Sequence, residues 1–130
     1  MRHFYSDLLG LSEKAYKEEW GYLCYVSEDL EMMFFRSDTK IPYIEEWADQ
    51  PGWEGGTLKI ASWAIGIPEG DFTNVYKQLK SEGVKMFNEE PEWRVDNYWG
   101  LTVKDPMGNT VEVYTIPKQK PESTTWKGGE

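Results

Sequence analysis

The fold of this chain follows from residues 98–116, YWGLTVKDPMGNTVEVYTI. Two runs rich in β-branched and aromatic residues, 98–104 and 110–116, flank the polar segment DPMGN at 105–109. Such runs favour β-strands, and Pro and Gly supply the backbone dihedral angles of a tight turn. The stretch therefore predicts two antiparallel strands joined as a hairpin.

The second strand of this hairpin has one polar and one apolar face. Because side chains alternate between the faces of a strand, Glu112, Tyr114 and Ile116 share one face. Val111 and Val113 share the other face, which is apolar and is expected to pack under a helix. The row that contains Glu112 is therefore the one expected to meet a ligand.

A strand and a helix are predicted before this hairpin. Residues 57–67, TLKIASWAIGI, read as a strand that ends before Pro68. Asp71 is a good N-cap for the helix, and Gly83 is a natural stop. The apolar residues of this helix fall at helical spacing: Phe72, Val75, Tyr76 and Leu79. On the strand, alternate positions form a row of mostly small side chains that leaves room for a ligand: Ile60, Ser62, Ala64 and Gly66.

The N-terminal part follows a similar plan. Residues 3–11, HFYSDLLGL, read as the last turns of a helix that Gly10 closes in a left-handed conformation. Residues 20–35, WGYLCYVSEDLEMMFF, predict a second hairpin around the polar tip at 27–29. One face of its last strand carries a polar, a flexible and an aromatic side chain: Glu31, Met33 and Phe35.

The two halves look like copies of one helix-plus-strands unit. Phe4-Tyr5 in the first helix corresponds to Val75-Tyr76 in the second, and the hairpin ending at 30–34 corresponds to the one ending at 111–114. Each unit alone exposes one face of its sheet, so pairing the two around a shared cavity explains the duplication.

These elements predict one domain over residues 1–116, with module one at 1–36 and module two at 57–116. The connection, residues 37–56, is rich in Pro, Gly and Trp and is expected to hold no more than one helical turn, at 43–47. The polar tail, residues 117–130, is expected to be ordered only if Trp126 docks on the domain or on a neighbouring subunit.

Composition excludes several classes of partner. The chain has 130 residues and a formal net charge of −9, which disfavours nucleic acid and anionic membrane surfaces. It has neither an apolar run long enough to span a membrane nor a signal segment, so we expect a cytoplasmic protein. Cys24, the single cysteine, lies in a strand-like run without a nearby His, which favours a buried inert thiol.

The ordered set FYSDLLGL, VYKQLKSEGV and WGLTVKDPMGNTVEVY is similar to the vicinal-oxygen-chelate superfamily, which contains glyoxalases, bleomycin-resistance proteins and extradiol dioxygenases. The resemblance covers nearly all of residues 3–116. It implies an α+β fold in which paired βαβββ modules form a cup-shaped mixed sheet with the helices outside, often completed as a homodimer. It also implies that the first strand of module one is missing from the chain.

The metal ligands of that superfamily are only partly present. Glu112 matches the carboxylate on the last strand of the second module, and Glu31 is its counterpart in the first. Ser62 stands where the metal enzymes have a His, and His3, the single histidine, lies at the chain end. Two carboxylates supply at most half of a four-ligand set, so we expect no cofactor; if a divalent metal ion binds, Glu31 and Glu112 are its ligands.

The leading interpretation is therefore a bleomycin-resistance-like, homodimeric protein that binds a small, partly apolar or aromatic molecule in its cup. The residues expected to bind this ligand are Glu31, Met33, Phe35, Ser62, Ala64, Trp99, Glu112 and Tyr114. Two alternatives stay open: a metal-dependent lyase or dioxygenase, and a structural module whose cup is filled by Trp93 or Trp99. The missing strand also has three explanations: an incomplete chain, a strand from a partner, or an edge protected by the tail. Whether the protein is an enzyme is left open, because one fold serves unrelated reactions.

Overall fold

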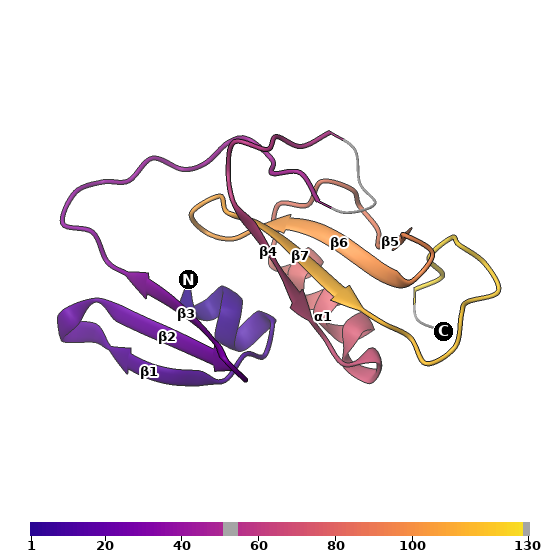
Figure 1. The fold of residues 1–130 in the computed structure, drawn as a ribbon, viewed down its shortest axis with the longest axis horizontal. Coiled ribbons are helices and arrows are strands. Elements are labelled where there is room, and N and C mark those ends of the chain that lie inside the picture. The colour runs from indigo at the N-terminus through magenta and orange to yellow at the C-terminus, as the bar shows by residue number, and fades with distance from the viewer. Residues whose placement is uncertain (51–54, 129–130) are drawn as a thin grey trace. The chain divides into compact units, whose positions relative to one another are not determined.

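The structure, a computed structural model, describes residues 1–50 and 55–128. It divides into two compact units, Met1–Tyr43 and Ile44–Glu130, each with its own β-sheet (Figure 1). The predicted mixed α+β class is confirmed, since each sheet is accompanied by a helix of its own unit. No helix within these described ranges is long and apolar enough to cross a membrane.

The second unit is a complete βαβββ module. Its elements are β4 (Ser62–Gly66), α1 (Glu69–Ser81), β5 (Glu92–Arg94), β6 (Tyr98–Lys104) and β7 (Thr110–Thr115). The strand order is β4-β7-β6-β5, with β4 parallel to β7 and the other neighbours antiparallel (Figure 1). The return through α1 is what allows β4 and β7 to run in parallel.

Helix α1 buries the four residues predicted from its spacing: Phe72, Val75, Tyr76 and Leu79. It begins at Glu69 with Pro68 as its N-cap, so the prediction that Asp71 caps it was wrong by three residues. Asp71 instead lies in the first turn, where its negative charge suits the helix dipole. The predicted stop at Gly83 is confirmed, because Gly83 has a φ of +72° and allows the chain to leave the helix.

The hairpin of β6 and β7 is confirmed with its predicted faces. Val111 and Val113 are fully buried, whereas Glu112 lies opposite Thr102 on the other face of the sheet. In the turn, Asp105 Oδ1 accepts hydrogen bonds from the backbone N–H groups of Met107 (2.9 Å) and Asn109 (3.0 Å). The hydrogen bonds of these two backbone N–H groups are therefore made within the turn itself and need no partner from the strands.

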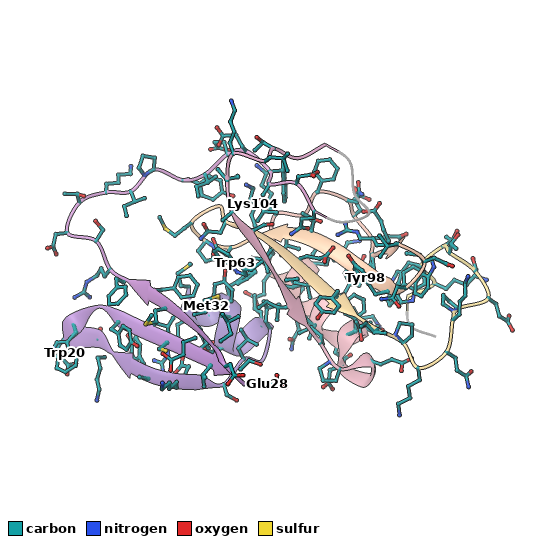
Figure 2. The ribbon with its side chains drawn as sticks, in the orientation of Figure 1. Trp20, Glu28, Met32, Trp63, Tyr98 and Lys104 are labelled. Atoms are coloured by element: carbon teal, nitrogen blue, oxygen red, sulfur yellow. The ribbon has the colours of Figure 1, made fainter. Side chains whose placement is uncertain are left out.

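Lys104 ties the beginning of the second unit to this hairpin. Figure 2 labels Lys104, which ends β6. Its ammonium group donates hydrogen bonds to the backbone carbonyl groups of Ile44, Glu46 and Gly108. Burial, and then the neighbouring charge of Lys85, lower the pKa of Lys104. A buried amine with carbonyl acceptors is the expected way to hold an irregular segment against a sheet.

The first unit contains a helix followed by an antiparallel sheet. Its elements are a π-helix (His3–Leu8), β1 (Glu13–Lys17), a short 3₁₀ helix (Glu18–Trp20), β2 (Tyr22–Ser27) and β3 (Leu30–Phe35), with strand order β1-β2-β3. The predicted hairpin at 20–35 is confirmed, as is Gly10 in the left-handed region, with a φ of +76°. Strand β1 was not predicted, because EKAYK is short and mostly polar.

The internal repeat is confirmed at the level of elements. β1, β2 and β3 follow their helix as β5, β6 and β7 follow α1. The second unit has β4 hydrogen-bonded to β7, whereas in the described residues β3 has a strand neighbour on one side only, β2. The first unit thus has the order expected for a module without its opening strand.

Three further segments differ from or complete the predictions. The strand predicted at 57–67 forms only over Ser62–Gly66, and Leu58 before it is 89% exposed. No helical turn forms at 43–47, where the chain bends instead, and residues 51–54 of the connection lie outside the described residues. In the tail, Trp126 does dock: its ring packs against those of Phe72, Tyr76 and Trp99.

Candidate functional site

The polar face of the second unit is organised around Glu112. Its Oε2 atom accepts a hydrogen bond from Arg94 Nη1 at 2.7 Å, and Tyr98 Oη donates to both carboxylate oxygens, at 3.0 and 3.1 Å. Glu112 is 4% and Arg94 1% exposed, so this is a buried ion pair. A buried charge is tolerated only when it is paired and hydrogen-bonded, and both conditions are met here.

Arg94 reaches Glu112 from the edge strand by crossing β6. A Cβ atom added to Gly100 would meet Arg94 Cδ at 2.7 Å, so the absent side chain at Gly100 is what makes room for the guanidinium stem. Arg94 Nη2 donates to Glu92 Oε1 at 2.9 Å, while its buried Nε atom has no hydrogen-bond partner among the described residues. The guanidinium therefore bridges two carboxylates and keeps one donor unused.

Tyr98 is the neutral member of the cluster. Burial raises the pKa of Tyr98 to about 12, with the adjacent negative charge of Glu112 as the second cause. The phenol therefore stays protonated at neutral pH and acts as a hydrogen-bond donor to the carboxylate. This direction agrees with the geometry, in which the hydroxyl faces both oxygens of Glu112.

The strands beside Glu112 provide an open stretch of the same face. Ala64 pairs with Glu112 and Gly66 with Tyr114 across the parallel β4–β7 ladder, and both β4 residues are exposed. A Cβ on Gly66 would stand 3.1 Å from Tyr114 Oη, so the phenol leans over the glycine. Next to Ala64, the half-buried Ser62 completes the row predicted to leave space. This face can offer a ligand an aromatic ring, hydroxyl groups and small neighbours.

The first unit repeats this arrangement at its own last strand. Glu31 of β3 forms an ion pair with Lys14 of β1, and this hydrogen bond raises the pKa of Lys14. The pair is exposed, in contrast to the buried pair in the second unit. Tyr22 begins β2 as Tyr98 begins β6, and an interaction with Cys24 raises its pKa. In both modules a basic side chain two strands away thus neutralises the repeated carboxylate.

The predicted site residues fall into three groups. Glu112, Tyr114, Ser62 and Ala64 share one face of the second unit's sheet, as their strand parity requires. Glu31, Met33 and Phe35 share one face of the first unit's sheet, where Met33 is 49% and Phe35 69% exposed. Trp99 differs from the prediction: it pairs with Thr115 and its ring contacts Trp126, so it lies on the face that carries α1 and not beside Glu112.

Sequence reasoning missed the partners of the two carboxylates. Arg94 lies 18 positions before Glu112, on a three-residue strand that periodicity cannot detect. The internal repeat does carry a signal, since Tyr22 and Tyr98 occupy matching places ahead of Glu31 and Glu112. Trp99 was misplaced because its face depends on the register of β6 with β7, which the sequence alone does not state.

The donors around Glu112 do not fit a metal ion in this arrangement. A cation bound to the carboxylate would stand beside the Arg94 guanidinium, whose like charge opposes it. Among the described residues no group of three His, Cys, Asp or Glu side chains gathers as a ligand set. Zinc, nickel and iron sites use several nitrogen or sulfur ligands, which this face lacks.

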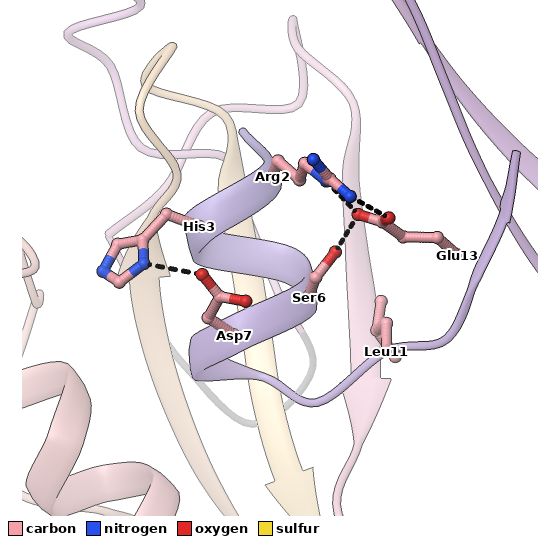
Figure 3. Close-up of a pocket in the computed structure, with 6 residues that line it drawn as sticks. All are labelled: Arg2, His3, Ser6, Asp7, Leu11 and Glu13. Carbon is pink, nitrogen blue, oxygen red and sulfur yellow. Dashed lines mark hydrogen bonds and ion pairs between the residues drawn. The ribbon is translucent and has the colours of Figure 1, made fainter. Parts of the chain in front are cut away.

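A separate surface cavity lies beside the helix of the first unit (Figure 3). It has a volume of about 550 Å³ and is lined by Arg2, His3, Ser6, Asp7, Leu11 and Glu13. Its charged groups are bonded to one another: Arg2 Nε donates to Glu13 at 2.6 Å, and His3 Nδ1 lies 3.0 Å from Asp7 Oδ2. These internal pairs leave the cavity without a free charge for a ligand.

Comparison with known proteins identifies the family of this chain. The family model described as Glyoxalase/Bleomycin resistance protein/Dioxygenase superfamily matches residues 1–113. Metapyrocatechase 2 from Cupriavidus necator is 34% identical over 80 residues, which cover 58% of this chain and 24% of that protein. The chain therefore spans about a quarter of the length of this curated relative.

Solved structures agree on the fold. A glyoxalase/dioxygenase from Nostoc punctiforme aligns with a TM-score of 0.61 and 18% identity, over 90% of this chain and 82% of that one. The fosfomycin resistance protein FosX from Mesorhizobium loti aligns with a TM-score of 0.57 and 14% identity, over 91% and 81% of the two chains. Identities this low speak for the fold alone. By the extent of the family match, this chain belongs to the Glyoxalase/Bleomycin resistance protein/Dioxygenase superfamily.

Proposed function

We propose that this protein binds a small, partly apolar or aromatic molecule on the sheet face that carries Glu112, without a resident metal ion. The observation that carries the proposal is the buried Arg94–Glu112 pair, in which a guanidinium occupies one side of the carboxylate. A permanent cation at this position neutralises Glu112 and removes the charge that a metal ion would otherwise meet.

The exposed neighbours of this cluster suit such a ligand. Tyr114 offers an aromatic ring and a hydroxyl group, while Ala64 and Gly66 leave space in front of the sheet. The first unit, considered by itself, has exposed apolar side chains, Met33 and Phe35, on the face of its own sheet that carries Glu31. Binding sites for small molecules typically combine apolar walls with a few polar groups that fix orientation.

The test combines metal analysis with ligand screening on the purified protein. We expect no stoichiometric zinc, nickel or iron, and a rise in melting temperature with some members of a library of aromatic and apolar small molecules. Tyr114→Ala should reduce that rise, whereas Glu28→Gln, an exposed turn residue, should not. If no library member raises the melting temperature, the small-molecule proposal is overturned; the alternative of a cup filled by Trp93 or Trp99 is wrong in either case, because both indoles lie on the face that carries α1.

A metal-dependent dioxygenase or lyase is the second candidate, and the similarity to a metapyrocatechase over 80 residues favours it. In this candidate the metal would displace the basic partners of Glu31 and Glu112. It predicts stoichiometric metal in the wild type that is lost in both Glu31→Gln and Glu112→Gln. That result would overturn the metal-free proposal, while the exposed control Glu28→Gln should keep its metal.

A homodimer in the cytoplasm completes the proposal. Strand β3 has a strand neighbour on one side only among the described residues, and an open edge of this kind favours association. The thiol of Cys24 is fully buried and unpaired with another cysteine, in keeping with a reducing compartment. Light scattering on the purified protein measures the mass in solution; a monomeric mass at micromolar concentration contradicts the dimer.

A further inference from the structure

The C-terminal tail builds one wall of a second cavity, at the β5 edge of the sheet. The ring of Trp126 meets Trp99 at 5.1 Å and Phe72 at 5.5 Å between centroids, both nearly perpendicular. Lys120 also forms an ion pair of 2.7 Å with Asp96, which holds the tail at a second point. The tail is therefore part of the packed unit in spite of its polar composition.

The cavity between this tail and β5 has a volume of about 520 Å³. It is lined by Asn88, Glu89, Glu90, Pro91, Glu92, Trp93, Thr124, Thr125 and Trp126. Trp93 pairs with Trp99, which lies on the face that carries α1, so its indole is on the opposite side of the sheet from Glu112. This size is sufficient for a small organic molecule.

Two indoles give the cavity aromatic walls held in place by their neighbours. Trp93 Nε1 donates to Asp96 Oδ1 at 3.0 Å, and its ring packs edge-on against Trp99. Trp126 Nε1 is buried without a hydrogen-bond partner among the described residues. Because this nitrogen has no exposed surface, a ligand in the cavity would contact the face or edge of the Trp126 ring and not its N–H group.

The charge of the lining is negative only. Three of the nine lining residues are glutamates and none is Lys or Arg. Glu92 is bonded to Arg94 and Asn88, whereas the exposed carboxylates of Glu89 and Glu90 have no ion-pair or hydrogen-bond partner in the described part of the chain. Negative charge next to indole rings is the combination that attracts organic ammonium ions.

We propose that this cavity binds a small organic ammonium ion. The ammonium group lies between the indole of Trp93 or Trp126 and the Glu89–Glu90 pair. The site lies outside the face assigned to the proposed function, so either assignment can fail without the other.

The test is a titration of the whole protein with choline and with 3,3-dimethyl-1-butanol, the neutral molecule of the same shape. Two-dimensional NMR of the indole N–H groups reports binding at Trp93 and Trp126. We expect choline to shift both signals, and to bind about tenfold more tightly than the neutral alcohol because only the cation interacts with the rings and carboxylates. Glu89→Gln with Glu90→Gln should weaken choline binding severalfold.

Matched variants separate the site from general charge effects. Glu18→Gln with Glu19→Gln removes an adjacent, exposed pair of carboxylates from the first unit and should leave choline binding unchanged. Trp93→Leu removes one aromatic wall of the cavity but keeps an apolar side chain, and should weaken choline binding. Equal affinity for choline and the neutral alcohol, equal effects of the two double variants, or no indole shift at millimolar choline each overturn the proposal.

Discussion

Arg94 lies directly over Gly100, so close that a Cβ atom on Gly100 would meet Arg94 Cδ at 2.7 Å and Nε at 3.1 Å. Gly100 is central in β6, where a glycine normally weakens a strand. Its role here is spatial, because the missing side chain is the passage through which Arg94 reaches Glu112. The buried ion pair thus depends on a residue that makes no polar contact with it.

Gly100→Ala should therefore destabilise the protein, by about 1–3 kcal/mol, because the added methyl group forces the buried Arg94 to move. Urea denaturation at neutral pH measures the change. Gly70→Ala is the matched control: a Cβ there meets nothing within 4 Å, and it lies in the first turn of α1. The control should be neutral or slightly stabilising. Equal stability of Gly100→Ala and wild type would show that the sheet accommodates the added methyl group without moving Arg94, and would contradict the prediction.

Arg94→Met should leave Glu112 buried without a cation and destabilise the protein by about 3–5 kcal/mol. Urea denaturation at neutral pH measures this loss. Adding Glu112→Leu to Arg94→Met should recover most of the loss, because the unpaired charge is then removed.

The repeat supplies a control for this experiment. Lys14→Met breaks the corresponding but exposed pair with Glu31 in the first unit. An exposed pair is screened by water, so this change should cost much less stability than Arg94→Met. Similar losses for Arg94→Met and Lys14→Met would contradict the assignment of a buried pair to the second unit alone.

Tyr98 should make stability depend on pH in the alkaline range. Its pKa is raised to about 12 in the folded protein, above the value of about 10 for an unfolded chain. A raised pKa stabilises the fold fully below about pH 10, and this contribution is lost as pH rises towards about 12. Tyr98→Phe should lower stability at neutral pH by about 1–3 kcal/mol and flatten the alkaline decline.

Denaturation of wild type and Tyr98→Phe from about pH 8 to about pH 11 measures this difference. Tyr16→Phe, which removes a partly exposed hydroxyl group from the first unit, is the control for loss of a phenol. An alkaline decline of the same slope in wild type and Tyr98→Phe would show that the Tyr98 hydroxyl does not carry the effect.

Sequence patterns predicted the structure correctly where a feature depends only on the residues of a single helix, strand or turn. Helical spacing identified all four buried residues of α1, and strand alternation separated Glu112 from Val111 and Val113. The turn at Asp105 to Asn109 was readable because its hydrogen bonds form within five residues. Boundaries were less accurate, since α1 begins at Glu69 and β4 at Ser62, where competing local preferences decide.

The sequence by itself determined the family, the duplicated plan and the face of each strand on which the two carboxylates lie. These follow from helical and strand periodicity, which backbone geometry imposes on any chain. Only the tertiary structure decided that Arg94 neutralises Glu112, that Trp99 lies on the face carrying α1, and that Trp126 closes a cavity. Those contacts join residues distant along the chain, so they depend on strand register and packing, which no local pattern specifies.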